Sequence, residues 1–213
     1  MPVLQWCVVV TTSMSRIENP ESLHRTLAAF NGERLRPGFP AAWSRRLARE
    51  LRQRVLEGEL LEEERAAVVA HAACAPTDPA GFIAWFERLK DEGPGQHDPL
   101  FAWLETEATL ADFRWFLTQE VAGEAGFEDL VALTQLKMPT RPKMEMAKNY
   151  WDEMGQGNPG GMHGPMLEHL ARELDLHPSH DEVVWESLAL GNMMIALALD
   201  RLYAFHSVGA LGA

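Results

Sequence analysis

A glutamate and a histidine, Glu153 and His163, lie ten positions apart on either side of a glycine-rich break. The residues before the break predict a helix over residues 143–154, with Glu153 near its end beside apolar and aromatic side chains. A carboxylate in such surroundings loses much of its hydration, so we expect it to be paired, protonated or bound to a cation. The glycines of the break stop the helix and allow the chain to fold back, so that His163 returns to the same pocket.

This pair of side chains has two interpretations. One carboxylate and one neutral imidazole make up half of a ligand set that suits iron, manganese or zinc. Alternatively, Glu153 is a solvated residue at a helix end and His163 is a residue of an exposed loop. The spacing of the two residues leaves both interpretations open.

Two further carboxylates, Glu120 and Glu124, interrupt the apolar face of a helix predicted over residues 111–136. The apolar members of that face are Phe113, Leu117, Phe127 and Val131. Other polar residues of the helix fall on faces where we expect solvent: Arg114, Gln119, Glu128 and Asp129. Glutamates on a core face, together with donors from neighbouring helices, can form a carboxylate-bridged metal site inside a helical bundle. The alternative is that both glutamates lie at the edge of the face and pair with Arg114 or solvent.

The remaining histidines are weaker candidates for a site. His180 follows the expected start of the last helix, at Ser179, so we expect it to be exposed. His169 lies six positions after His163 and does not share its helix face, which favours a surface or core role. The sequence contains neither a glycine-rich phosphate loop nor the motif of a serine hydrolase or a zinc protease.

The elements that must position these residues are helices, and the predicted fold class is all-α. Helical periodicity covers most of the chain, over residues 20–30, 41–57, 61–73, 80–90, 99–110, 111–136, 143–154, 165–174 and 182–207. Ser179 and Glu182 have the spacing of a capping box for the last of these helices. The clearest break lies at residues 91–99, so we divide the chain into an N-terminal helical region, 1–95, and a helical core, 96–213.

Composition and charge narrow the function classes. The chain has 213 residues, 46% of them hydrophobic, and a formal net charge of −12. This charge argues against a nucleic-acid surface and against binding to an anionic membrane. The two cysteines, Cys7 and Cys74, have no metal-like spacing, so we expect a reduced cytoplasmic setting. Residues 1–12 are apolar but too short to span a bilayer, and we expect them to form a packed or frayed arm.

Three runs of the sequence resemble the iron-containing redox enzymes, which are haem-oxygenase-like diiron oxidases and oxygenases. The runs are FLTQEVAGEAGF at residues 116–127, NYWDEMG at 149–155 and MHG at 162–164. The resemblance extends over about residues 99–213. It implies a helical bundle that binds iron, up to two ions, activates dioxygen and oxidises a small organic substrate. It also implies that the metal ligands are Glu120 or Glu124 from one helix, Glu153 from the next, and His163.

The chain departs from the family pattern at its C-terminal end. The family expects a closing helix with two more histidines and an aspartate, and residues 207–213 contain none of these. We therefore expect a C-terminally incomplete bundle, with an exposed apolar surface beside the final helix that a second copy or another chain covers. A catalytically incomplete scaffold or binding protein of the same fold is the alternative function. A haem-binding relative would need a histidine on the helix at 111–136, which has none.

Overall fold

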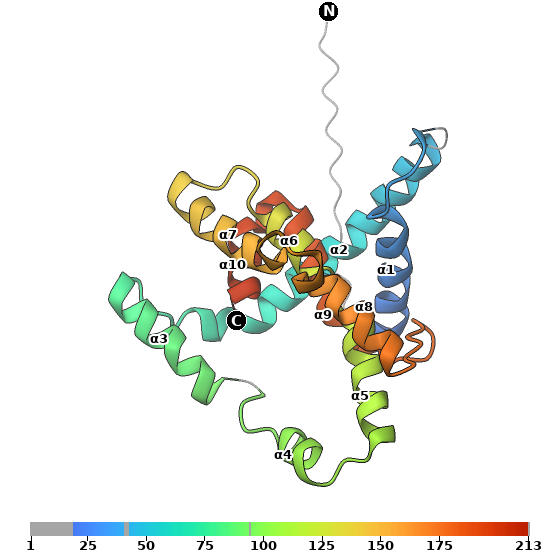
Figure 1. Ribbon diagram of the computed structural model, residues 1–213. Helices are drawn as coiled ribbons and strands as arrows, with labels where there is room; N and C mark the ends of the chain where they lie inside the picture. The colour runs from blue at the N-terminus through green and yellow to red at the C-terminus, as the bar shows by residue number, and fades with distance from the viewer. Residues whose placement is uncertain (1–18, 41–42, 94, 213) are drawn as a thin grey trace, which may run out of the picture.

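The computed structural model describes residues 19–40, 43–93 and 95–212, which fold into helices with no strand among them (Figure 1). The all-α prediction is confirmed. The helices are α1 (Pro20–Arg34), α2 (Trp43–Ala72), α3 (Pro79–Glu92), α4 (Pro99–Thr106), α5 (Leu110–Gly123), α6 (Phe127–Thr134), α7 (Thr140–Glu153), α8 (His163–Glu173), α9 (Trp185–Leu199) and α10 (Ala204–Gly212). Short 3-10 turns, η2 (Gly155–Gly157), η3 (Pro159–Gly161) and η4 (Arg201–Tyr203), connect some of them. The predicted arm at residues 1–12 lies outside the described residues.

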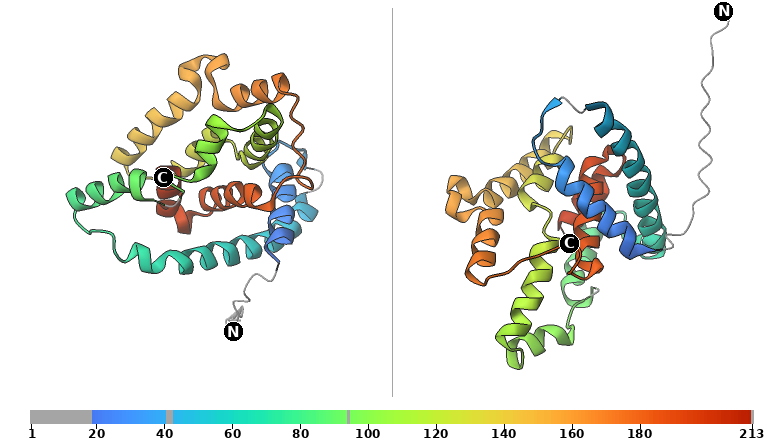
Figure 2. Two further views of the ribbon diagram at one scale, coloured as in Figure 1. Left: turned by 90° about the horizontal axis from the view of Figure 1, so that it is seen from below. Right: turned by 90° about the vertical axis from the view of Figure 1, so that its right-hand side faces the viewer.

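Helix α9 is the centre of the fold. It packs against α1, α2, α5, α6 and α10, and Figure 2 shows it enclosed among these helices. Its buried side chains lie on all sides of the helix, as its apolar sequence predicts, and include Leu188, Met194, Ile195 and Leu197. Because α1 and α2 pack on α9, the N-terminal helices share a core with the C-terminal ones. The division of the chain at residues 95 and 96 stays a prediction.

A buried polar network fixes how α1 lies on α9. The Asn31 amide nitrogen donates to the Asn192 side-chain oxygen at 2.9 Å, and the Asn192 amide nitrogen donates to the backbone carbonyl of His24 at 2.9 Å. The completely buried Leu27 lies between these contacts along α1. Hydrogen bonds between buried amides are costly to break, so they favour one register of the two helices over others.

Buried His24 makes stability depend on pH. Its ring stacks on Trp185 with a centroid distance of 5.4 Å, and burial lowers its pKa below 6.5, with Glu186 acting weakly in the opposite direction. The unfolded chain therefore binds a proton at His24 more readily than the folded chain does. As far as His24 is concerned, we expect the free energy of unfolding to be highest above about pH 6.5 and to fall as the pH drops below that value. Urea unfolding at pH 7.5 and 5.5 measures this, and His24→Gln should show a smaller difference between the two pH values.

Helices α5 and α9 approach closely because glycines face each other. A Cβ atom on Gly191 would lie 2.6 Å from the backbone oxygen of Gly123, and one on Gly123 would lie 2.6 Å from that of Ser187. Any side chain at these two positions would push the helices apart. The close approach brings the end of α5, which carries the candidate glutamates, against the core.

The helix predicted over 111–136 is wrong, because the chain leaves the helix at Gly123. Glu124 has extended backbone angles, and Gly126 has a φ of 75°, a left-handed conformation that glycine adopts at little cost. The shared apolar face from Phe113 to Val131 therefore does not exist, and Glu124 lies in a turn. Helix α5 instead begins with a capping box between Thr109 and Asp112.

Two other helix predictions also differ from the structure. The segments predicted at 41–57 and 61–73 form one helix, α2, which continues through Gly58 because one glycine costs a helix interior only about 1 kcal/mol. The helix predicted at 182–207 starts later, at Trp185, and stops at Asp200, whose side chain accepts from the Leu202 backbone. The Ser179 capping box is wrong, since α9 has no side-chain cap.

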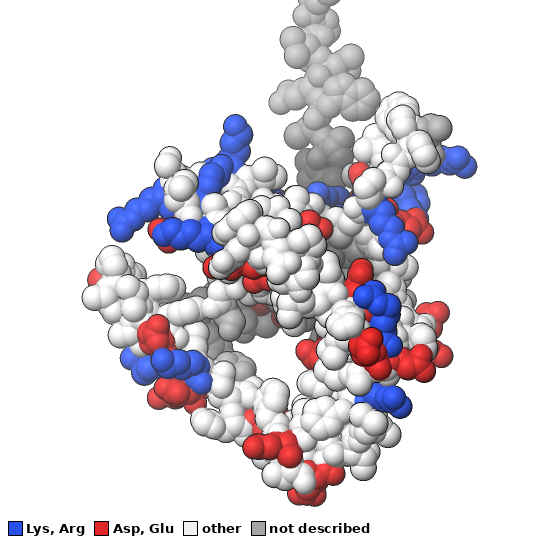
Figure 3. Space-filling view, in the orientation of Figure 1, with Lys and Arg blue, Asp and Glu red and all other residues white. Residues whose placement is uncertain are grey.

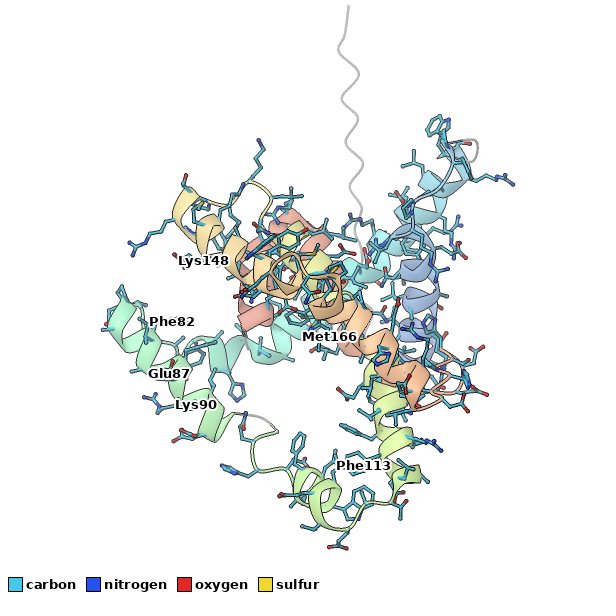
Figure 4. The ribbon with its side chains drawn as sticks, in the orientation of Figure 1. Phe82, Glu87, Lys90, Phe113, Lys148 and Met166 are labelled. Atoms are coloured by element: carbon cyan, nitrogen blue, oxygen red, sulfur yellow. The ribbon has the colours of Figure 1, made fainter. Side chains whose placement is uncertain are left out.

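Helices α3 and α4 form an arm that stands away from the core. Phe82, Ile83 and Phe86 on α3 are 45%, 61% and 36% exposed, and no residue of α3 is buried. Figure 3 shows open space between this arm and the body, and Figure 4 shows Phe82, Glu87 and Lys90 projecting from α3. The α9–α10 end also carries exposed apolar side chains, Leu202 and Phe205.

Of the helices in the described part of the chain, none is by itself long and apolar enough to cross a bilayer. Helices α9 and α10 reach that length only when taken together, and the chain bends by 96° between them.

Candidate metal centre

The turn between α7 and α8 closes the ten-residue separation of the two leading candidates. Gly155 and Gly157 have φ values of 59° and 86°, which turn the chain back on itself. A Cβ on Gly155 would lie only 2.5 Å from the backbone of Gly161, so the two sides of the turn are in close contact. An antiparallel bridge between Met154 and Met162 holds them together. The residues before and after this bridge, Glu153 and His163, are thereby placed side by side.

Glu153 and His163 meet as expected. An oxygen of Glu153 (Oε2) lies 3.2 Å from Nδ1 of His163. The Glu153 side chain is 20% exposed and the His163 side chain is 44% exposed, so the imidazole is open to solvent and the carboxylate is partly covered. The two residues are therefore in contact, and their role as metal ligands stays a prediction.

Glu124 reaches the same imidazole from the turn after α5. Its Oε1 accepts from the backbone N–H groups of Gly126 and Phe127 at 2.9 and 3.1 Å, which fixes the carboxylate against the start of α6. Its other oxygen, Oε2, lies 3.6 Å from Nε2 of His163. The Phe127 ring stacks on the imidazole at a centroid distance of 6.1 Å and limits its rotation. Of the two alternatives in this region, Glu124 is the one that faces His163.

Glu120 lies one turn earlier and is exposed. It lines a cavity of about 380 Å³ together with Glu124, and α9 contributes Glu186, Leu190 and Met194 to the same cavity. No contact joins Glu120 to His163 among the described residues. Its predicted role as a metal ligand stays a prediction.

A second, larger cavity lies on the other side of the imidazole. It has a volume of about 740 Å³ and is lined by Glu153, His163, Met166, Leu170 and other residues of α8. His169 and Glu173 also line it, although His169 is exposed and its spacing from His163 did not predict a place near the site. The imidazole of His163 therefore faces a carboxylate on each side, and each of these carboxylates borders a different cavity.

The donor types fit an iron ion. Two donors of one metal ion lie roughly 3 to 3.6 Å apart when each bond is about 2.1 Å long. Each carboxylate lies at such a distance from His163, but they approach opposite ring nitrogens. Accordingly, no three acidic, histidine or cysteine donors converge on one point within the part of the chain that the structure describes. Each carboxylate thus forms a separate two-donor pair with His163, at opposite nitrogens of the ring.

An orphaned oxygen supports a cation in this region. Glu128 was expected to face solvent, but its Oε2 is buried and has no hydrogen-bond partner in the described residues. Its other oxygen lies close to Gly164, at the start of α8 and next to His163. A buried carboxylate oxygen without a donor is costly, and a nearby cation would satisfy it. A single sequence gives no signal for this burial, because it arises from the packing of α6 on α8.

The other polar residues of this region have structural roles. Gln119 was also expected in solvent, but it is 6% exposed and its Oε1 accepts from the backbone N–H of Val184 at 2.9 Å. It thus connects α5 to the start of α9. His180 is exposed, as predicted.

Comparison with known families agrees with this part of the chain. Residues 114–213 match the model of a family described as iron-containing redox enzymes. The match confirms the resemblance noted in the sequence, supports a haem-oxygenase-like bundle and supports a general iron-dependent redox role. It spans α6 to α10 and most of α5, and so includes all four candidate ligands. No curated protein and no solved structure matches the chain.

Proposed function

We propose that this chain, whose residues 114–213 match the iron-containing redox enzymes, is an iron-dependent oxidase or oxygenase that activates dioxygen and oxidises a small organic substrate. The observation that carries the proposal is that His163 contacts two carboxylates within the matched region, Glu124 at Nε2 and Glu153 at Nδ1. These three residues would hold iron. When bound, iron would supply the one-electron redox chemistry and the dioxygen binding that amino-acid side chains do not offer.

The side chains around the candidate ligands have distinct tasks in this proposal. The N–H groups of Gly126 and Phe127 hold one oxygen of Glu124, which leaves the other oxygen directed at His163. Stacking on Phe127 orients the imidazole. Such supporting contacts set ligand geometry and commonly change metal affinity by roughly 10- to 100-fold when lost.

The two cavities border different candidate ligands, the smaller one Glu124 and the larger one Glu153 and His163. Leu130, Leu190 and Met194 give the smaller cavity apolar walls. Met166, Leu167 and Leu170 give the larger cavity an apolar side beside Glu153. Its volume of about 740 Å³ falls in the range of small-molecule sites, so we assign the organic substrate to it.

Anaerobic loading with Fe(II) tests the proposal. We expect the desalted chain to retain stoichiometric iron and its absorbance spectrum to change when dioxygen is added, with consumption of dioxygen measured by an electrode. A chain that retains no iron would support the alternative of a scaffold or binding protein, which the opposite placement of the two carboxylates favours. A Soret band after incubation with haem would instead identify a haem-binding relative.

A further inference from the structure

A basic corner stands out in this acidic chain. Seven of its fifteen arginines lie between residues 34 and 54, where α1 ends and α2 begins. Figure 3 shows Lys and Arg side chains gathered at the upper right, over this corner. The corner lies outside residues 114–213, so the family match does not account for it.

Four of these arginines line one pocket. Its volume is about 260 Å³, and its walls are Phe30, Glu33, Arg34, Arg45, Arg46 and Arg49. The guanidinium carbons of Arg34 and Arg49 lie 4.8 and 5.4 Å from the centroid of the Phe30 ring. Phe30 is 2% exposed, so it supports the two guanidinium groups and leaves little ring surface for a ligand to stack on.

Arg34 is the buried residue of the pocket. Its side chain is 6% exposed, and its Nη1 donates to Oε2 of Glu57 at 3.2 Å. Its Nε is buried and has no hydrogen-bond partner in the described part of the chain. A guanidinium group carries five N–H donors in a fixed plane, and the Nε of Arg34 is a donor that the described residues leave unused.

The other arginines of the pocket differ in their pairing. Arg46 pairs with Glu50 at 3.1 Å, and Arg49 pairs with Glu33. Arg45 makes no ion pair or hydrogen bond within the described residues and is exposed. The three glutamates therefore balance three of the four guanidinium groups, and the pocket keeps an excess positive charge.

We propose that this pocket binds a phosphate group. A phosphate offers several oxygens and up to two negative charges, which suits a set of guanidinium groups better than a single carboxylate does. It would pair with Arg45, share the free N–H groups of Arg46 and Arg49, and provide an acceptor for Arg34. Because Phe30 is covered, recognition rests on the phosphate group and not on an attached ring.

Titration of the full chain with inorganic phosphate at constant ionic strength tests this inference. We expect saturable binding by calorimetry, and a loss of about tenfold or more in affinity for Arg45→Ala. The matched control is Arg52→Ala, which removes the same charge from an exposed position of α2 outside the pocket. Both variants should keep the melting temperature of the parent chain, since neither arginine makes a hydrogen bond or an ion pair in the described residues and both are exposed.

Two outcomes would overturn the inference. One is that the parent chain binds neither inorganic phosphate nor vesicles containing phosphatidic acid. The other is that Arg45→Ala and Arg52→Ala lose affinity equally, which would indicate attraction to the general charge of the corner. Binding to the vesicles alone, abolished by Arg45→Ala but not by Arg52→Ala, would support the pocket and identify a lipid headgroup as the source of the phosphate.

Discussion

Replacing Glu153 or His163 with alanine is expected to lower the iron affinity of the chain by more than the roughly 10- to 100-fold that loss of an outer contact costs. The reason is that Oε2 of Glu153 and Nδ1 of His163 lie 3.2 Å apart, so each substitution would remove one donor from the same ion. Glu124→Gln should have a similar effect, because it removes charge while the amide oxygen can still accept from Gly126 and Phe127. Iron retained per chain, and competition with a chelator of known affinity, measure the change.

Controls for these variants come from the same helices or their neighbours. His180→Ala removes an exposed histidine, and Glu168→Ala removes a carboxylate from the exposed side of α8, so both should keep the affinity of the parent chain. Glu120→Ala distinguishes the two glutamates of the α5 region, and we expect a smaller loss than for Glu124→Gln. Equal losses in the control and site variants would show that iron binds elsewhere or without specificity.

Gly155→Ala is expected to weaken iron binding without removing any candidate ligand. A residue with a side chain at a φ of 59° costs about 1–2 kcal/mol, and its Cβ would lie 2.5 Å from the backbone of Gly161. The turn must open to relieve this contact, and the bridge between Met154 and Met162 opens with it. His163 then moves away from Glu153, so iron affinity should fall even under conditions in which the variant remains folded.

Gly160→Ala is the matched control for this variant. Gly160 lies in the same turn, but its φ is not left-handed and its added Cβ would lie 3.5 Å from Asn158, an ordinary contact. It should bind iron as the parent chain does. Parent-like iron affinity in Gly155→Ala, measured with the same chelator, would contradict the view that the turn positions His163.

The sequence predicted the parts of the site that depend on local structure. Glu153 and His163 could be paired because the glycines between them dictate a tight return, and this needs no knowledge of the rest of the fold. Glu124 was named for the wrong reason, since it faces His163 from a turn and not from a helix face. The residue that could have indicated the turn is Gly126, which adopts a left-handed conformation. A glycine can also lie inside a helix, so its presence in the sequence does not by itself predict a turn.

Other features could not be predicted because they arise from contacts between distant helices. The burial of Gln119 depends on the backbone of Val184, and that of Glu128 on the approach of α8. Along α5 and α6 both residues fall where a single amphipathic helix would face water. The continuity of α2 through Gly58 is a different case, because one glycine can either end a helix or be tolerated inside it.

The detached arm has a consequence for how the chain unfolds. Helix α3 has no buried residue and α4 has only Leu104, whereas α9 is buried over most of its length. Little apolar surface is lost from contact with the core when the arm opens, so its amide protons exchange with solvent through local openings of low free energy. Those of α9 exchange only when the whole core comes apart. We therefore expect the arm to open before the core does. Helices α7 and α8, which carry Glu153 and His163, have no buried residue either, so on the same argument their amide protons should exchange before those of α9.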